Sequence, residues 1–306
     1  MPLDPQFAEV LALFAQGPPL SEVPLPLLRT GRPKPEGFEP TPVAQIIDRT
    51  IPGPAGDIRI RIYRPHAEDE GMPVAVFMHG GGFILGDLDS HDEIARVLTM
   101  RTPCVTVAID YRLAPENPFP AAPEDCFAAL QWVAGHAGEF GGDASRIAVV
   151  GDSAGGNLAA VMTLRSRDEH GPKICGQVLI YPLTDAVDSD ELKPAPDGKL
   201  HFFKAKDGAF FNSLYFSDPS NARHPHASPM FAEEVGGLPP ARVITAEYDP
   251  LCRQGDAYAV RLEAAGVEVT HSRYASAIHG FVSFPVPMAA EALGETAAWL
   301  KRRFAA

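Results

Sequence analysis

Apolar runs and amphipathic stretches alternate along most of the chain, and this alternation predicts strands and helices in turn. The apolar runs are short and rich in β-branched residues, as buried strands are; they cover residues 74–78, 105–110, 146–151, 178–181, 242–247 and 268–274. Helical patterns lie at 90–102, 123–139, 154–169 and 253–265, with a last one at 287–304. Strands that alternate with helices are typical of a mostly parallel sheet flanked by helices on both faces. The expected fold class is therefore α/β.

Two further strands are predicted ahead of this series, at residues 44–51 and 58–63. In the second of them Ile58, Ile60 and Ile62 alternate with two arginines. A period of two indicates a strand with one buried and one wet face, and a Pro/Gly-rich turn separates the two runs. We expect an antiparallel pair.

The first 42 residues have a different pattern. Asp4 and Pro5 fit the N-cap and first position of a helix, and proline-rich sequence follows from residue 24 to 42. Between them lie apolar residues at helical spacing, which are Phe7, Val10, Leu11 and Phe14. Residues 1–42 are therefore predicted to form an N-terminal cap segment on a main domain of residues 43–306. The pattern does not decide whether this segment covers a pocket or packs on the surface.

The alternation has its longest interruption between residues 182 and 240. A long insertion in a compact domain is usually a lid or a binding element, and we predict a cap insertion at about residues 183–220. It is rich in aromatic residues, for which ordinary core packing is the alternative. The side chains predicted to line a substrate pocket are Phe83, Phe202, Phe203, Phe211 and Leu214.

The net charge of −13 limits the classes of molecule that the chain is expected to bind. An acidic chain disfavours nucleic acid and anionic membrane, and no apolar run has the length of a membrane span. The start lacks a signal-like pattern, and the 4 cysteines in 306 residues are too sparse for a disulfide framework. We expect a cytoplasmic protein with reduced thiols and with neither nucleic acid nor membrane as a partner. Cys252 is interpreted as a small buried residue.

The candidate chemistry centres on residues 146–157. A buried run ends in Gly-Asp-Ser-Ala-Gly at residues 151–155, and a helical pattern follows. A strand, a sharp turn and a helix are the context in which Gly-x-Ser-x-Gly presents a nucleophilic serine. The glycines are expected where strand and helix pass too close for a Cβ. Ser153 is the predicted nucleophile; the alternative is a glycine-rich turn of some other α/β protein.

A second glycine motif, His-Gly-Gly-Gly-Phe, occupies residues 79–83 directly after a predicted strand. Consecutive glycines let backbone N–H groups turn toward a common point, as an oxyanion hole requires. A flexible turn is the alternative, but the motif matches the oxyanion loop of lipases and esterases.

A serine nucleophile needs a base and an acid that orients the base. In proteins with a Gly-x-Ser-x-Gly elbow, the acid follows the serine along the chain and the histidine comes last. Asp249 directly follows the strand predicted at 242–247, and His279 lies between the last strand and the last helix. Both positions are at carboxyl ends of strands, where ligands bind in open α/β sheets. These residues are the predicted acid and base.

Other residues of the right type are less well placed; they are Asp152, Asp185, Asp256 and His271. The first should point away from the serine on a tight turn and is interpreted as a structural hydrogen bonder. Two do not directly follow a strand, and the last lies inside one. His224 and His226 lack the further ligands that a metal needs, so neither a metal nor a cofactor is expected.

Together these motifs resemble the hormone-sensitive-lipase-like carboxylesterases of the α/β-hydrolase superfamily, in the branch whose elbow reads Gly-Asp-Ser-Ala-Gly. The resemblance extends from about residue 40 to the end of the chain. The matching stretches are residues 79–82, 110–116, 118–122, 151–157, 249–251 and 279–281. Residues 252–255 depart from the family, which often continues Asp-Pro-Leu with an Asp and a Glu-Gly where this chain has Cys-Arg-Gln-Gly.

The resemblance implies an α/β-hydrolase fold with a helical cap and ester hydrolysis through an acyl-enzyme. The residues that carry over are Ser153, His279 and Asp249 as nucleophile, base and orienting acid, Gly81, Gly82 and Ala154 as backbone donors of the oxyanion hole, and His79 as a brace of the glycine loop. Two covering segments favour short- to medium-chain esters. An amidase or peptidase with the same triad and a non-catalytic small-molecule receptor are the alternatives. A strand at 268–274, if it lies at a sheet edge, could pair with a second copy in a homodimer.

Overall fold

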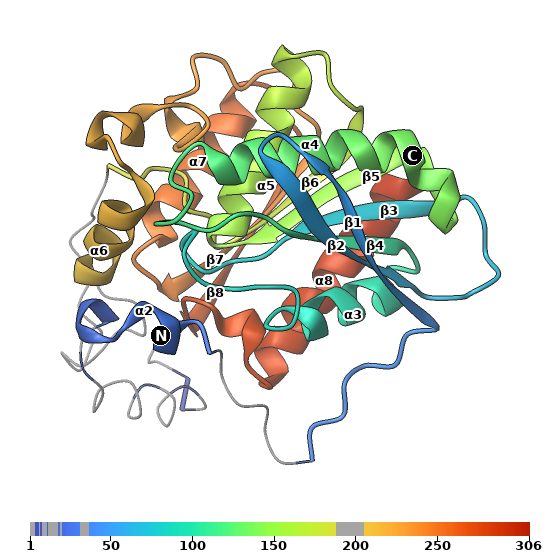
Figure 1. Cartoon of the computed structure of the whole chain (residues 1–306), viewed down its shortest axis with the longest axis horizontal. Helices are drawn as coiled ribbons and strands as arrows, with labels where there is room; N and C mark the ends of the chain where they lie inside the picture. The colour runs from blue at the N-terminus through green and yellow to red at the C-terminus, as the bar shows by residue number, and fades with distance from the viewer. Residues whose placement is uncertain are drawn as a thin grey trace.

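A computed structural model describes residues 4, 5, 7, 11, 18, 20–30, 37–187 and 205–306 of the chain. An eight-stranded sheet runs through its centre (Figure 1) in the order β1-β2-β4-β3-β5-β6-β7-β8. The strands are β1 (Gln45–Gly53), β2 (Gly56–Arg64), β3 (Met72–Met78), β4 (Val105–Asp110), β5 (Gly142–Asp152), β6 (Ile174–Ile180), β7 (Ala241–Tyr248) and β8 (Val269–Ile278). The first two are antiparallel to their neighbours, and β3 to β8 run parallel. All eight predicted strands and the antiparallel pair are confirmed.

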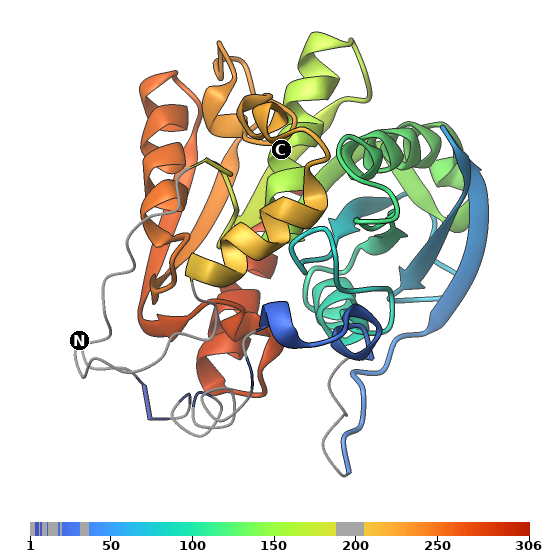
Figure 2. The same cartoon turned by 60° about the vertical axis from the view of Figure 1, so that its left-hand side comes forward.

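Helices cover both faces of the sheet (Figure 2), as the alternating pattern predicts. On one face α3 (Asp92–Arg101) and α8 (Pro287–Phe304) share a core that includes Leu98 and Trp299. On the other face α4 (Ala121–His136), α5 (Ala154–Asp168) and α7 (Cys252–Ala264) form the larger core, which includes Phe127, Leu158 and Leu262. The described residues also form short 3₁₀ turns; they are Leu20–Glu22, Ala137–Phe140, Pro219–Arg223, Pro229–Phe231 and Phe281–Ser283.

Two element boundaries differ from the prediction in ways that matter for the site. α3 begins at Asp92 rather than at residue 90, because the side chain of Asp87 accepts the N–H of Ser90 (2.7 Å) and so closes a separate turn. β8 continues past residue 274 to Ile278, which still pairs with Tyr248 after a bulge. The strand therefore delivers the next residue, His279, directly at its carboxyl end.

Two short helices, α2 (Leu25–Leu28) and α6 (Ala205–Tyr215), lie side by side apart from the helical layers (Figure 1; Figure 2). The described part of residues 1–42 has two placements. Phe7 and Leu11 are buried in the core beneath α3 and α8, whereas residues around α2 face the cavity described below. Val10 and Phe14 lie outside the described residues, and a domain division at residue 42 stays a prediction. None of the helices in the described ranges combines the length and the apolar character needed to cross a membrane.

Candidate active site

Ser153 occupies a strained turn between β5 and α5. Its φ is 55° and its ψ is −117°, a region that residues with a side chain rarely adopt. A Cβ on Gly151 would overlap the carbonyl oxygen of Gly155, and a Cβ on Gly155 would overlap that of Met78. Both glycines are therefore required by the close approach of backbone segments. The turn is also tied to the neighbouring strand, because Ser153 N–H donates to the Ile180 carbonyl (2.8 Å).

The structure brings Ser153, His279 and Asp249 together in one hydrogen-bonded chain. Ser153 Oγ lies 2.9 Å from His279 Nε2, and His279 Nδ1 lies 2.7 Å from Asp249 Oδ2. The second carboxylate oxygen, Oδ1, accepts the Leu251 N–H (2.8 Å), and the Asp249 side chain is fully buried. A carboxylate at Nδ1 places a hydrogen on that nitrogen and leaves the Nε2 lone pair toward the serine hydroxyl. The arrangement can therefore remove the serine proton.

The glycine loop that follows β3 turns its N–H groups in two directions. Gly80 N–H points back to the elbow and donates to Asp152 Oδ1 (2.9 Å). Within the described ranges, no acceptor engages the N–H groups of Gly81, Gly82 or Ala154. Gly81 has φ 122° and Gly82 φ 63°, values that favour glycine. These three free donors border the cavity beside the serine.

His79 lies behind this loop and is 2 % exposed. Its Nδ1 lies 2.8 Å from the Gly80 carbonyl oxygen, its own carbonyl accepts the Tyr111 hydroxyl (2.8 Å), and its ring stacks on Tyr111. Burial, together with the charge of His91, lowers the pKa of His79 to about 4. The imidazole is therefore neutral near pH 7 and contacts the glycine loop from the side away from the cavity.

A cavity of about 1810 Å³ opens above Ser153 and His279. Of the predicted pocket residues, Phe83 and Phe211 line it. Leu214 does not line it, which corrects the prediction: at about 100° per residue, this side chain lies on the face of α6 opposite to Gly208 and Asn212, which do line it, and it packs on the larger core. Phe202 and Phe203 lie outside the described residues.

The N-terminal segment is fastened over the cavity by Arg29, which sequence reasoning missed. Its guanidinium donates to the carbonyls of Ile84 (2.8 Å, from Nε) and Ala114 (2.7 Å, from Nη2) and makes two bonds of 2.7 and 2.8 Å to Glu116. The Arg29 hydrogen bond lowers the pKa of Glu116 to about 2. Arg29 is the first basic residue of the chain and directly follows the apolar run Leu25–Leu28, a signal that could have drawn attention to this position.

The less well placed candidates lie outside the hydrogen-bonded chain of three. Asp256 contacts His271 (3.0 Å) and Arg273, and Cys252 Sγ lies 3.8 Å from the same carboxylate. Asp152 accepts the Gly80 N–H, so its expected role as a structural hydrogen bonder is in keeping with its contacts. In the part of the chain that the structure describes, no group of three or more His, Cys, Asp or Glu side chains could hold a metal ion.

The departure from the family motif has a structural consequence at Gln254. Its side-chain oxygen accepts the N–H groups of Thr184 (2.6 Å) and Asp185 (2.9 Å), and its amide nitrogen donates to the Asp185 carbonyl (3.2 Å). The carboxamide thus joins α7 to the segment after β6, which borders the cavity. Asp185 lies on this border.

Comparisons with known proteins identify the family of the chain. A family model described as the alpha/beta hydrolase fold matches residues 75–283. The chain is 44 % identical over 269 residues to Carboxylesterase NlhH of Mycobacterium tuberculosis, covering 85 % of this chain and 83 % of that protein. It is 38 % identical over 245 residues to an arylesterase of Saccharolobus solfataricus, covering 80 % and 79 % of the two chains.

A solved structure extends the similarity to the whole chain. The hyperthermophilic esterase from the archaeon Pyrobaculum calidifontis superposes with a TM-score of 0.91 at 40 % identity and covers 100 % of both chains. The expected architecture, a mostly parallel sheet flanked by helices, is therefore confirmed by the structure and by its neighbours.

Proposed function

Because this chain belongs to the α/β-hydrolase fold family, in its hormone-sensitive-lipase-like branch of carboxylic ester hydrolases, we propose that it hydrolyses its ester through Ser153, His279 and Asp249. The observation that carries this proposal is the pair of hydrogen bonds, 2.9 and 2.7 Å long, that joins the three side chains at the floor of the cavity. A hydroxyl, an imidazole and a buried carboxylate in this order are the components of nucleophilic acyl transfer.

In the acylation step Ser153 Oγ attacks the ester carbonyl carbon while His279 Nε2 takes the hydroxyl proton. The carbonyl oxygen becomes an oxyanion, which the N–H groups of Gly81, Gly82 and Ala154 stabilise as donors. The intermediate then collapses: the bond to the alcohol oxygen breaks, and His279 returns its proton to that oxygen. The products are an acyl-enzyme and a free alcohol.

In the deacylation step water attacks the acyl carbon, and His279 accepts one of its protons. A second oxyanion forms in the same place, and its collapse breaks the bond to Ser153 Oγ, which regains its proton from His279. Asp249 keeps the imidazole in one orientation throughout and stabilises its charge when it is protonated. A carboxylic acid leaves, and the resting site is restored.

The proposed substrates are short- to medium-chain esters. This proposal is supported by two segments that cover the cavity. The N-terminal segment lines it with Leu20, Leu28 and Arg29, and the segment around α6 lines it with Phe211 and Phe216. A covered cavity limits the length of the acyl chain, whereas an open apolar surface would admit long chains. Rates on p-nitrophenyl esters of increasing acyl length test this, and a maximum at long chains would contradict it.

Activity profiling of Ser153→Ala tests the reaction itself. We expect turnover of p-nitrophenyl acetate to fall by roughly 10⁴-fold or more, and a phosphonate ester to label the wild-type protein on the peptide that contains Ser153. Ser145→Ala, at an exposed position of β5 where the hydroxyl donates to Asp143, is the matched control and should keep wild-type rates. Matched ester and anilide substrates separate an esterase from an amidase, and an anilide preference would contradict the proposal.

The proposed partners and location follow the sequence-based expectations. β8 lies at one edge of the sheet, so a homodimer that pairs through this strand is a prediction, which sedimentation tests. A cytoplasmic location without nucleic acid or membrane as a partner is likewise a prediction.

A further inference from the structure

The carboxylate of Asp152, next to the nucleophile, is buried without an arginine or lysine among the contacts that the described residues make with it. Its side chain is 5 % exposed, and Oδ1 accepts the Gly80 N–H at 2.9 Å. Burial opposes ionisation, but His91, the Gly80 amide and His79 outweigh it and leave the pKa of Asp152 below its ordinary value. A buried anion of this kind needs donors that hold it.

The ring of His91 faces the Asp152 carboxylate. Its Nε2 lies 3.5 Å from Asp152 Oδ1, and its ring is 5.4 Å from that of His79. His79 has a pKa of about 4, chiefly through burial, and is neutral at working pH. His91 is less enclosed, with 14 % of its side chain exposed, and it borders the cavity. His91 is therefore the ring that is placed to donate a hydrogen bond to Asp152.

The contacts of the second ring nitrogen of His91 determine where its protons lie. Nδ1 is 3.0 Å from Ser90 Oγ, and the same hydroxyl is 3.0 Å from the Asp87 carbonyl oxygen. If Ser90 donates to Nδ1, the neutral ring carries its one hydrogen on Nε2. If Ser90 donates to Asp87 instead, Nδ1 must itself donate, and a neutral ring would then turn a lone pair on Nε2 toward the carboxylate. The first arrangement gives the buried carboxylate a donor at Nε2, and it is the one that we adopt here.

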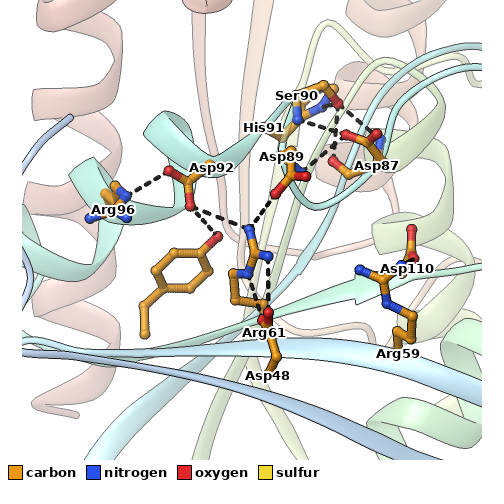
Figure 3. A network of polar contacts seen from close by, with 11 residues as sticks. Asp48, Arg59, Arg61, Asp87, Asp89, Ser90, His91, Asp92, Arg96 and Asp110 are labelled. Carbon is orange, nitrogen blue, oxygen red and sulfur yellow. Dashed lines mark hydrogen bonds and ion pairs between the residues drawn. The ribbon is translucent and has the colours of Figure 1, made fainter. Parts of the chain in front are cut away.

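The turn that carries His91 is held from behind by a charged network (Figure 3). Arg61 on β2 donates to Asp89 (2.7 Å) and also faces Asp92 (3.7 Å) at the start of α3. Asp92 in turn accepts the Tyr63 hydroxyl (2.9 Å) and the Arg96 guanidinium (2.6 Å). The network fixes the backbone on both sides of His91, so the ring approaches Asp152 from a fixed base.

We propose that His91 is a positioning residue of the oxyanion loop: its Nε2–H holds the Asp152 carboxylate, which holds the Gly80 amide one residue before Gly81. The inference rests on the proposed function, because it matters only if Gly81 binds the oxyanion. Asp152 adjoins Ser153 in the chain and Gly80 in space, so one carboxylate sets the distance between nucleophile and oxyanion donors. His91 keeps that carboxylate in place.

The test compares His91→Phe, which keeps a ring but no donor, with His91→Gln, which keeps a donor. We expect kcat on p-nitrophenyl acetate to fall roughly 10-fold in His91→Phe, less than the loss of a whole oxyanion donor, with KM within about twofold. His91→Gln should recover kcat to within about threefold of wild type, since its amide can donate to the carboxylate. His136→Phe, on a ring that stacks on Trp132 at the end of α4, is the control and should match wild type.

A double-mutant cycle separates positioning from a general structural role. If His91 acts through Asp152, then His91→Phe combined with Asp152→Asn should lose no more kcat than the worse single variant. Multiplied losses would overturn the proposal, as would a kcat in His91→Phe within twofold of wild type or a kcat loss that His91→Gln does not recover. Titration with a p-nitrophenyl phosphonate keeps the two hypotheses apart: a wild-type protein that releases no nitrophenol contradicts the proposed function, whereas stoichiometric release with an unchanged His91→Phe contradicts only this inference.

Discussion

The two sides of the cavity are built in different ways. On the sheet side, backbone segments touch one another directly, so that Gly151 and Gly155 leave no space for a Cβ and Ser153 is held at φ 55°. On the cover side, side chains make the contacts, as when Arg29 bonds the loops beneath it and Asn212 on α6 donates to the Ala186 carbonyl (2.7 Å).

This difference predicts which side tolerates substitution. A change on the sheet side forces backbone atoms apart or unpairs a buried charge, and both are costly. A change on the cover side removes a hydrogen bond whose partners water can replace, because Arg29 and Glu116 are 27 % and 56 % exposed. The chemistry should therefore depend on the first side, and the range of substrates on the second.

Asp249→Asn should have the largest effect of the sheet-side changes. The amide can present a donor to His279 Nδ1 and so favour the wrong tautomer, and we expect kcat to fall by roughly 10⁴-fold with the fold intact. Stopped-flow and steady-state rates with circular dichroism measure this. Asp256→Asn is the matched control, since Asp256 contacts His271 and Arg273 instead. Equal losses of kcat in the two variants would contradict the proposal that Asp249 orients His279.

Gly155→Ala should test the backbone contact itself. The new Cβ would overlap the Met78 carbonyl oxygen, and we expect a loss of about 3 kcal/mol or more in the free energy of unfolding. Gly135→Ala near the end of α4 meets no atom within 4 Å and should stabilise by about 0.5–1 kcal/mol, because alanine favours helix. Urea denaturation compares the two, and a fully stable Gly155→Ala would refute the close-approach argument.

The sequence predicts the sheet side of the cavity better than the cover side. Strand-turn-glycine patterns are local, so the positions of Ser153, Asp249 and His279 at strand ends follow from alternation and turn chemistry. Arg29 meets Glu116 across 87 residues, and no local pattern pairs them. The apolar, aromatic-rich insertion at about residues 183–220 predicts Leu214 in the pocket, but such a pattern does not give the rotation of a helix.

His91 shows a third kind of case. Its residue type is visible in the sequence, but a helix was predicted to include it, and the turn at residues 87–90 displaces the helix start by two positions. Its contact with Asp152 joins two stretches 61 positions apart that lie on either side of the glycine loop. Only the folded arrangement shows that the two side chains face each other.

Arg29→Ala should sharpen the comparison from the cover side. Loss of the Arg29 hydrogen bonds loosens the N-terminal segment over the cavity. The ratio of kcat/KM for octanoate esters to kcat/KM for acetate esters should therefore rise roughly fivefold, while kcat on the acetate ester stays within about threefold of wild type. Arg29→Lys keeps the charge but not the two-pronged geometry and should fall between. Arg49→Ala removes another Arg–Glu pair, with Glu139, outside the cavity lining, and should leave the ratio unchanged. A fall in acetate turnover as large as that of Asp249→Asn would erase the distinction between the two sides.

The smallest expected effect is the pH dependence of the stability that the Arg29–Glu116 ion pair contributes. The Arg29 hydrogen bond lowers the pKa of Glu116 to about 2, below its ordinary value of about 4.5, so the folded protein holds the ionised form more tightly than the unfolded chain does. Its contribution to stability is therefore fully present above about pH 4.5 and is lost as the pH falls toward 2. Because the pair is largely exposed, we expect about 1 kcal/mol or less. Unfolding of wild type and Glu116→Gln should differ by that amount at pH 6, and the difference should shrink below pH 4.5 and disappear only below about pH 2; a difference that instead grows in acid would show that the carboxylate contributes through something other than its charge.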